Sequence, residues 1–286
     1  MELTYAKILI LAVLQGACEL LPVSSSAHVI IAEKLLGLDP AAPDMTLLLV
    51  MLHTGTMFAV IIYFWTSWRN CFFATKAGLV RYAGLIAVAT CCTGVVGMAL
   101  KVVIEKVALR RIPGAEVELL FGNLALIAAA LAAVGALIIY AGSRDGGVRD
   151  EIGPKESALI GIVQGLCLPF RGFSRSGATI STGMLIGINR IRSEEFSFAL
   201  AVVLTPPVVL REILRMVKAH ALPAGGTSGL LHLFVPSLVG MAASFVAGYL
   251  ALKWLSHWLE AGRWKLFGYY CLALSLIVFL LKLAGV

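Results

Sequence analysis

The sequence predicts an all-α polytopic membrane protein, and three observations support this fold class. Hydrophobic residues make up 60% of the 286 residues, charged residues make up 14%, and the mean hydropathy is +0.94. Apolar stretches long enough to cross a bilayer recur along the whole chain, and two further apolar stretches are interrupted by polar and helix-breaking residues. A water-soluble domain cannot bury this much apolar surface, so we expect one integral membrane domain over residues 1–286.

Uninterrupted apolar stretches predict the membrane crossings. A helix needs roughly 20 residues to cross about 30 Å of hydrocarbon. Tryptophans such as Trp65 and Trp254 stand near the ends of these stretches, where aromatic rings favour the headgroup level. We therefore expect about six full transmembrane helices, at residues 45–66, 80–101, 119–142, 194–217, 230–253 and 264–284.

The two interrupted stretches, 3–36 and 155–188, predict a different structure. The first is broken at Gln15 to Ser26 and the second at Gln164 to Ser176. Irregular backbone at membrane depth is tolerated only where it faces protein or a water-filled cavity. Each stretch is therefore predicted to form a re-entrant helical hairpin.

The two breaks also resemble one another, which indicates an internal repeat with halves of about 1–142 and 143–286. Each break has a Gln-Gly pair, then a proline, then a cluster of hydroxyl residues. Three full spans between the hairpins would make them enter from opposite faces, so that their tips meet near the midplane. The expected architecture is an inverted repeat, as in membrane proteins built from two related halves.

Charge and cysteine content exclude two classes of function. The formal net charge is +7, but lysine and arginine are spread over many short breaks, so we expect membrane lipids and no nucleic acid as partners. The positive-inside bias is slight and favours both termini outside the cytoplasm. The six cysteines form no zinc-type pattern with each other or with histidine, and are expected to pack as small apolar residues.

The first break concentrates chemistry-bearing residues within an apolar stretch, where an ionisable group costs several kcal/mol unless it is paired or hydrated. Gln15 and Glu19 share one helix face, and His28 lies three residues after Ser25 at the start of the next helix. The alternative is a structural role, with Ser24 to Ser26 as helix caps and His28 as a hydrogen-bonded core residue. That alternative leaves Glu19 unexplained.

The second break has the ingredients of a phosphate site. Its glycines let backbone approach an anion closely, the start of a helix supplies N–H groups, and arginine binds two oxygens at once. Alternatively, the arginines form a structural ion pair with Glu19. The candidate residues here are Arg171, Gly172, Ser174, Arg175, Ser176, Gly177 and Thr179.

Together the two breaks resemble the motifs of undecaprenyl-diphosphate phosphatases, the bacitracin-resistance type of integral membrane phosphatase. The first break is similar to (E/Q)-x-x-x-E followed by P-V-S-S-x-x-H, and the second to P-G-x-S-R-S-x-x-T. The similarity continues at 52–56 and at 194–198. Two positions depart from the pattern. Gln15 is the amide option, which weakens any mechanism that needs two carboxylates, and Arg171 precedes Gly172, with Pro169 displaced by two residues.

The resemblance implies hydrolysis of undecaprenyl diphosphate to undecaprenyl phosphate and inorganic phosphate. This reaction recycles the lipid carrier for cell-wall synthesis and gives bacitracin resistance. It also implies a bacterial cytoplasmic (inner) membrane location, with the site facing the periplasm or cell exterior, and it leaves a homodimer open. The resemblance assigns catalysis to Glu19, Ser25, His28 and Arg175, and substrate binding to Gln15, Ser24, Ser26, Arg171, Gly172, Ser174, Ser176, Gly177 and Thr179.

Two features of the mechanism stay open in the sequence. The nucleophile is either Ser25, which the family pattern favours, or a water positioned by Glu19 and His28. From the resemblance we expect dependence on Mg²⁺ or Ca²⁺, with Glu19 and substrate phosphates as ligands. His53 either faces the same cavity or is a buried, hydrogen-bonded histidine. Glu194 and Glu195 are expected at a solvated or interfacial helix end.

A polyprenyl-phosphate flippase is the rival function, alone or in addition to hydrolysis. Inverted repeats with broken helices are typical of alternating-access carriers, and the same arginine and serines would hold a lipid headgroup. A purely structural scaffold would leave both polar breaks without a purpose. The combination of Glu19, Ser25 and His28 beside a phosphate loop favours the enzyme, because binding alone needs no nucleophile with a base.

Overall fold

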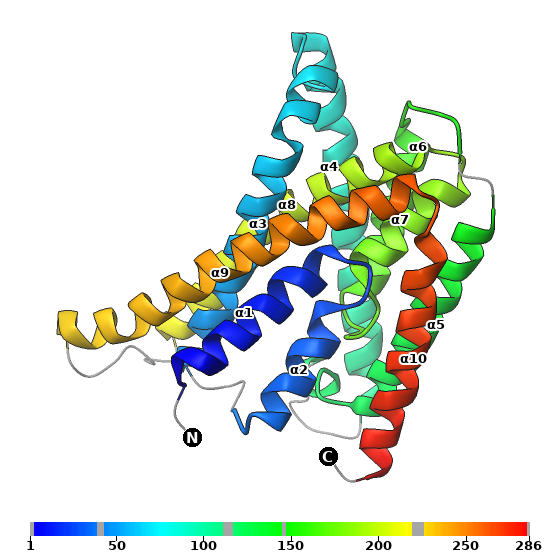
Figure 1. Ribbon diagram of the computed structural model, residues 1–286. Helices are drawn as coiled ribbons and strands as arrows, with labels where there is room; N and C mark the ends of the chain where they lie inside the picture. Colours follow the sequence, from blue (N-terminus) through cyan, green and yellow to red (C-terminus); the bar gives the residue numbers. More distant parts are fainter. Residues whose placement is uncertain (1–2, 39–42, 111–116, 145–146, 219–225, 285–286) are drawn as a thin grey trace. The chain divides into compact units, whose positions relative to one another are not determined.

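The computed structural model describes residues 3–38, 43–110, 117–144, 147–218 and 226–284 (Figure 1). Within these ranges the regular structure is helical, apart from one isolated β-bridge between Arg149 and Ile188. The predicted all-α fold class is confirmed. The elements are α1 (Tyr5–Leu20), α2 (Ser25–Leu35), α3 (Pro43–Cys71), α4 (Lys76–Val103), η1 (Ile104–Ala108), η2 (Val117–Leu120), α5 (Leu124–Ser143), α6 (Pro154–Cys167), α7 (Arg175–Leu185), α8 (Arg190–Lys218), α9 (Gly226–Glu260) and α10 (Trp264–Leu283).

Five helical segments of the described chain are long and apolar enough to cross a membrane: Met45–Cys71, Lys76–Val107, Leu124–Ser143, Phe234–Glu260 and Trp264–Leu283. They match five of the expected crossings. The remaining expected stretch, 194–217, forms most of α8 but is not among these five. This crossing stays a prediction.

Both interrupted stretches form a helix, a turn and a second helix, but each first helix continues further than expected. Gln15 and Glu19 lie in α1, and Gln164 lies in α6. The expected starts of the breaks were therefore wrong. Gln and Glu favour helix, so the first interruption begins only at Leu21, whose extended backbone (ψ 149°) precedes Pro22. Re-entry of either hairpin into a membrane stays a prediction.

The lengths of the helices repeat in the two halves of the chain. Helices α1 to α5 contain 16, 11, 29, 28 and 20 residues, and α6 to α10 contain 14, 11, 29, 35 and 20. The predicted repeat with halves of about 1–142 and 143–286, and the inverted relation between them, stay predictions.

The helices form two compact units that are discontinuous in sequence. Unit 1 comprises Met1–Leu21, His28–Trp65 and Ala201–Leu255. Unit 2 comprises Pro22–Ala27, Thr66–Leu200 and Ser256–Val286. The turn between α1 and α2 therefore belongs to unit 2, whereas the helices on either side of it belong mainly to unit 1.

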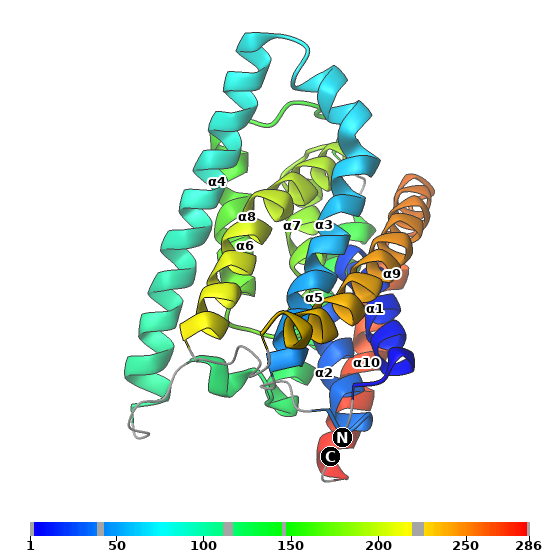
Figure 2. The same cartoon turned by 90° about the vertical axis from the view of Figure 1, so that its left-hand side faces the viewer.

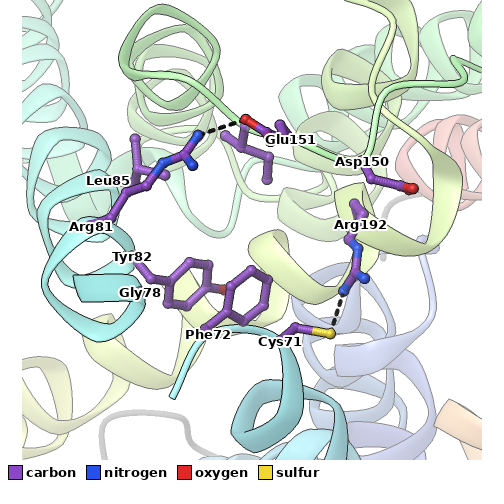
Figure 3. Close-up of a pocket in the computed structure, with 10 residues that line it drawn as sticks. Cys71, Phe72, Gly78, Arg81, Tyr82, Leu85, Asp150, Glu151 and Arg192 are labelled. Atoms are coloured by element: carbon purple, nitrogen blue, oxygen red, sulfur yellow. Dashed lines mark hydrogen bonds and ion pairs between the residues drawn. The ribbon is translucent and has the colours of Figure 1, made fainter. Parts of the chain in front are cut away.

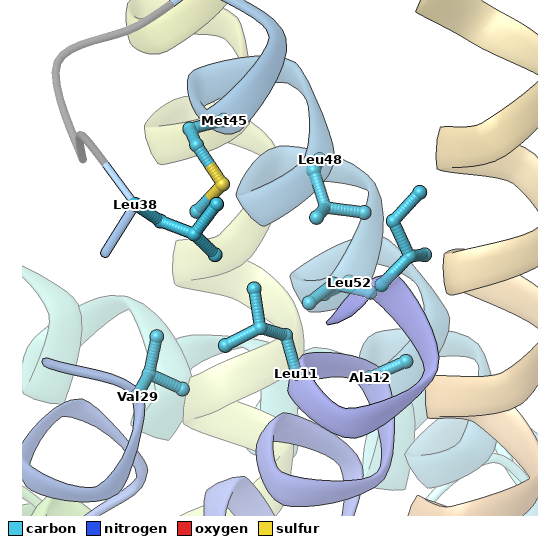
Figure 4. Packing of buried hydrophobic residues seen from close by; sticks show 8 residues of the cluster. Leu11, Ala12, Val29, Leu38, Met45, Leu48 and Leu52 are labelled. Atoms are coloured by element: carbon cyan, nitrogen blue, oxygen red, sulfur yellow. The ribbon is translucent and has the colours of Figure 1, made fainter. Parts of the chain in front are cut away.

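Unit 1 is held by apolar packing of α1, α2 and α3 and by close contact of α1 and α3 with α9. Figure 4 shows Leu11 and Ala12 of α1 beside Leu48 and Leu52 of α3, all almost fully buried. A Cβ on Gly16 would lie 2.5 Å from the carbonyl oxygen of Ser244. Such backbone-to-backbone contacts through small residues are the usual packing mode of membrane helices.

Unit 2 contains two closely packed helix pairs, α4 with α6 and α5 with α10 (Figures 1 and 2). A Cβ on Gly161 of α6 would lie 2.3 Å from the carbonyl oxygen of Ala89 in α4. The Thr93 hydroxyl of α4 donates to the carbonyl of Gly161 at 2.9 Å and accepts from Gln164 Nε2 at 3.1 Å. These contacts fix α6, which leads into the second hairpin turn.

Gly55 provides a test of the contact between α3 and α9. A Cβ at this position would lie 2.3 Å from the carbonyl oxygen of Met241, so Gly55→Ala must push the helices apart. We expect a loss of about 1–3 kcal/mol in the free energy of unfolding, measured by denaturant titration in detergent. Gly84→Ala in α4 is the matched control, because nothing lies within 4 Å of its added Cβ. Equal effects of both substitutions would contradict the close contact.

Candidate functional site

Three polar residues of unit 1 meet at the C-terminal end of α1. Gln15 Nε2 donates to Glu19 Oε2 at 3.2 Å, and the same carboxylate oxygen lies 3.9 Å from His53 Nε2. His53 Nδ1 lies 2.8 Å from the carbonyl oxygen of Leu49. Because a carbonyl only accepts, Nδ1 carries the proton, and His53 presents Nε2 to Glu19. The structure therefore places His53 beside a catalytic candidate, one of the two alternatives left open by the sequence.

Burial gives Gln15 and Glu19 different roles. The Gln15 side chain is buried, whereas the Glu19 side chain keeps 20% of its surface exposed. Glu19 can therefore reach a ligand, while Gln15 orients the carboxylate from one helical turn below. His28 lies one turn into α2 and is half-buried.

The serine turn in unit 2 has an unusual backbone. Ser24 adopts φ 66°, in the left-handed region that non-glycine residues rarely occupy. Its hydroxyl lies 3.3 Å from that of Ser26, and its side chain is buried. Ser25 is half-buried and begins α2. The turn thus brings the hydroxyls of Ser24 and Ser26 together at the start of α2.

The second hairpin turn requires glycine and begins with a helix cap. Gly172 has φ 96°, and a Cβ there would lie 2.6 Å from the carbonyl oxygen of Ile127. The Ser174 hydroxyl accepts from the Gly177 N–H at 3.2 Å and lies 3.4 Å from the Ser176 hydroxyl. Arg175 is the first residue of α7, next to N–H groups that carry the positive end of the helix dipole.

The tips of the two hairpins lie together within unit 2. The Gly172 N–H donates to the Ser26 hydroxyl at 3.4 Å. A Cβ on Gly177 would lie 3.3 Å from Pro22 Cβ, so the start of α7 is in contact with the serine turn. The structure thereby brings together residues that are about half the chain apart in sequence.

Two predicted binding residues make other contacts. Arg171 is exposed, and its guanidinium carbon lies 4.4 Å from the centre of the Phe121 ring. The buried Thr179 hydroxyl donates to the carbonyl of Arg175 at 2.8 Å and lies 2.6 Å from the Ser197 hydroxyl. Thr179 therefore joins α7 to α8, and Arg171 stacks on an aromatic ring beside the turn.

The structure corrects the expectation for Glu194 and Glu195, which are both almost fully buried. Ser256 donates to Glu194 at 2.8 Å, and Glu195 accepts from Ser67 and from Arg192. Sequence reasoning assigned the pair to a solvated or interfacial helix end because charged residues are rarely buried. The one signal for burial was Arg192, three residues before Glu195.

A metal site made only of protein groups is not present in the part of the chain that the structure describes. No three His, Cys, Asp or Glu side chains are grouped there. The partly exposed Glu19 carboxylate still offers oxygen ligands of the type that Mg²⁺ accepts together with phosphate oxygens. The donor set thus fits a cation that binds together with a phosphorylated substrate.

A separate pocket of unit 2, about 240 Å³ in volume, contains none of the predicted site residues (Figure 3). Arg81 donates to Glu151 at 2.9 Å, and this hydrogen bond holds the pKa of the Glu151 carboxyl below its usual value. Arg192 contacts Cys71 Sγ at 3.2 Å and Glu195 at 2.6 Å. Arg81 and Arg192 are each paired with a glutamate, so we interpret this pocket as a structural junction of α3, α4 and α8.

The fold and the site together define a polytopic helical membrane protein with a polar centre at two broken helices. A profile of the family "Bacitracin resistance protein BacA" matches residues 8–277. The chain belongs to this family.

Curated relatives match nearly the whole chain. It is 56% identical over 272 residues to undecaprenyl-diphosphatase 2 of Acinetobacter baylyi, a match that covers 95% of each chain. Undecaprenyl-diphosphatase of Desulfosudis oleivorans is 35% identical, over 93% of this chain and 94% of the relative. The protein of the same name from Rhodopirellula baltica is 32% identical, over 97% and 98%.

Arg192 and Arg81 allow a matched test of the pocket's ion pairs. The Glu195 side chain is only 3% exposed, so Arg192→Met leaves a buried carboxylate without its cation. We expect a loss of about 3 kcal/mol or more in the free energy of unfolding in detergent. Arg81→Met removes an exposed pair with Glu151 and should have no measurable effect. Equal losses would contradict the difference in burial between the two pairs.

Proposed function

We propose that this protein is an undecaprenyl-diphosphate phosphatase, which hydrolyses undecaprenyl diphosphate to undecaprenyl phosphate and inorganic phosphate. The observation that carries the proposal is the junction of the two hairpin tips, where the Gly172 N–H reaches the Ser26 hydroxyl beside the first turn of α7. The names of the curated relatives agree with this activity. The reaction would return the lipid carrier to cell-wall synthesis and give resistance to bacitracin.

Arg175 and the start of α7 are suited to hold the terminal phosphoryl group. The guanidinium can donate to two oxygens, and the N–H groups of the first turn add the partial positive charge of the helix end. Both favour the charge that spreads over the phosphoryl oxygens in the transition state. Gly172 and Gly177 let this turn pack closely against Ile127 and Pro22.

Of the three serines, Ser25 is the nucleophile that the family pattern favours. Ser24 is buried, which makes it a poorer candidate. Ser25 stands half-exposed at the start of α2, and His28 follows three residues later on the same side of the helix. The alternative nucleophile is a water held by Glu19 and His28.

In the serine mechanism, the Ser25 oxygen bonds to the terminal phosphorus as the bond from that phosphorus to the bridging oxygen breaks. Undecaprenyl phosphate leaves, and the hydroxyl proton passes to His28 or Glu19. Water then attacks the phosphoserine, which releases inorganic phosphate and restores the hydroxyl. Gln15, whose Nε2 donates to Glu19, would hold the Glu19 carboxylate in position during both steps.

Glu19 would hold a divalent cation, Mg²⁺ or Ca²⁺, together with substrate oxygens. The cation would supply positive charge to the diphosphate. The protein is a multi-pass membrane protein, and we place it in the bacterial cytoplasmic (inner) membrane with the site facing the periplasm or cell exterior. The resemblance to the family supports this orientation, and a homodimer stays a prediction.

Lipid transport without hydrolysis is the alternative function. A flippase would need the arginine and the hydroxyl groups but no nucleophile with an adjacent base. The relatives are named as diphosphatases, so the comparisons do not favour this alternative.

Variants of the site test the proposal by phosphate release from undecaprenyl diphosphate in detergent with Mg²⁺ or Ca²⁺. We expect Glu19→Gln, Ser25→Ala and Arg175→Ala to lower kcat by about 100-fold or more, because each removes a group that acts on the reacting atoms. Ser275→Ala and Arg144→Ala are matched controls, since Ser275 donates to the Ala128 carbonyl and Arg144 to the Tyr140 hydroxyl, outside the site. Thermal unfolding checks that each variant is folded.

Wild-type protein that releases no phosphate with either cation would contradict the proposed function. If Ser25→Ala keeps the wild-type rate while Glu19→Gln loses it, water is the nucleophile and the phosphoserine step is wrong.

A further inference from the structure

Helix α7 and the first turns of α8, both in unit 2, meet along a buried seam of small and hydroxyl residues. Thr179 of α7 lies opposite Ser197 of α8, and one turn further along α7, Gly183 lies against Ser193. The two serines and Thr179 are at most 1% exposed. Thr179, a predicted binding residue, is thereby connected to a residue of α8 that the proposed chemistry does not use.

The hydrogen bonds across this seam have one direction. A hydroxyl group has a single proton but can accept two hydrogen bonds. The Thr179 hydroxyl lies 2.8 Å from the carbonyl oxygen of Arg175 and 3.5 Å from that of Ser176, and carbonyls only accept, so the Thr179 proton points to them. The Ser197 hydroxyl, 2.6 Å from Thr179 Oγ1, must therefore donate to it. Ser197, Thr179 and the Arg175 carbonyl form one chain of hydrogen bonds.

This chain of hydrogen bonds holds the beginning of α7 against α8. Arg175 is the first residue of α7, so the bond to its carbonyl fixes the backbone of the turn that carries the guanidinium. A serine within a helix commonly donates to the carbonyl four residues earlier, as Ser193 does to Asn189 at 2.9 Å. Ser197 instead directs its hydroxyl to another helix, so its hydrogen bond contributes to the placement of α7.

We propose that Ser197 is a positioning residue for Arg175: through the Thr179 hydroxyl, it fixes the first turn of α7. The proposal rests on the proposed function and adds a residue to which that function assigns no role. Arg175 must donate to the phosphoryl oxygens at a set distance, and a displacement of about 1 Å can cost about 100-fold in rate. The buried hydroxyl pair limits such a displacement, because neither group is open to water.

The test compares two serines of the same seam. Ser197→Ala removes the donor to Thr179 but leaves no buried donor unpaired, because Thr179 can still donate to the Arg175 carbonyl. Ser193→Ala is the matched control, since Ser193 is equally buried, lies one turn earlier in α8 and packs against Gly183, but donates to a carbonyl of its own segment. Ser197→Cys is a second variant, which keeps the size of the side chain but has a weak donor.

We expect Ser197→Ala to lower kcat for undecaprenyl diphosphate about tenfold, Ser197→Cys to lower it less, and Ser193→Ala to leave it within about twofold of wild type. In the Arg175→Ala background, Ser197→Ala should cost less than about twofold, because no guanidinium remains to be positioned. A purely structural role would give the same loss in both backgrounds. That outcome, or an unchanged rate in Ser197→Ala, would overturn the proposal.

Amide hydrogen exchange separates failure of this inference from failure of the proposed function. In detergent, Ser197→Ala should speed the exchange of peptides at the start of α7 several-fold, and Ser193→Ala should not. This pattern in a protein that releases no phosphate would disprove the hydrolase while retaining the contact that fixes α7. Exchange at α7 that Ser197→Ala leaves unchanged, in a protein that does release phosphate, would disprove the positioning role alone.

Discussion

The structure depends on how two interrupted helices satisfy their backbone groups inside an apolar protein. Helix α1 ends just before Pro22 in the first hairpin. In the second hairpin, Gly172 has a positive φ, and a side chain there would clash with the Ile127 carbonyl. Each interruption leaves N–H groups that cannot be left unsatisfied at membrane depth. The Ser26 hydroxyl accepts one of them, from Gly172, and the Ser174 hydroxyl accepts another at the start of α7. Polar side chains are therefore required at the turns for folding.

The same requirement provides the chemistry. Serine hydroxyls, backbone N–H groups and an arginine at a helix start can hydrogen bond within the turns, and the same groups can bind an anionic phosphoryl group. Glu19 and His53 add a carboxylate and an imidazole at the C-terminal end of α1. The proposed enzyme thus uses, for the diphosphate, polar groups that the fold already needs at its turns.

Local sequence patterns predicted the features that depend on neighbouring residues. The lengths of the apolar stretches predicted five helices that the structure contains, and the positions of proline and glycine predicted the two helix interruptions. The exact start of each break was wrong because Gln15 and Gln164 can continue a helix. Contacts between segments that are distant in the sequence could not be predicted in this way. The position of His53 beside Glu19, the burial of Glu194 and the stacking of Arg171 on Phe121 each depend on packing that periodicity does not encode.

The most direct test of the central claim is a double-mutant cycle on phosphate release between Ser25→Ala and Arg175→Ala. Groups that act on the same transition state are strongly non-additive, so the double variant should be about as slow as the slower single variant. This result would establish that the serine turn and the start of α7 form one catalytic unit. If the two losses multiply, the residues act independently, and the account of a single site at the joined hairpin tips is contradicted.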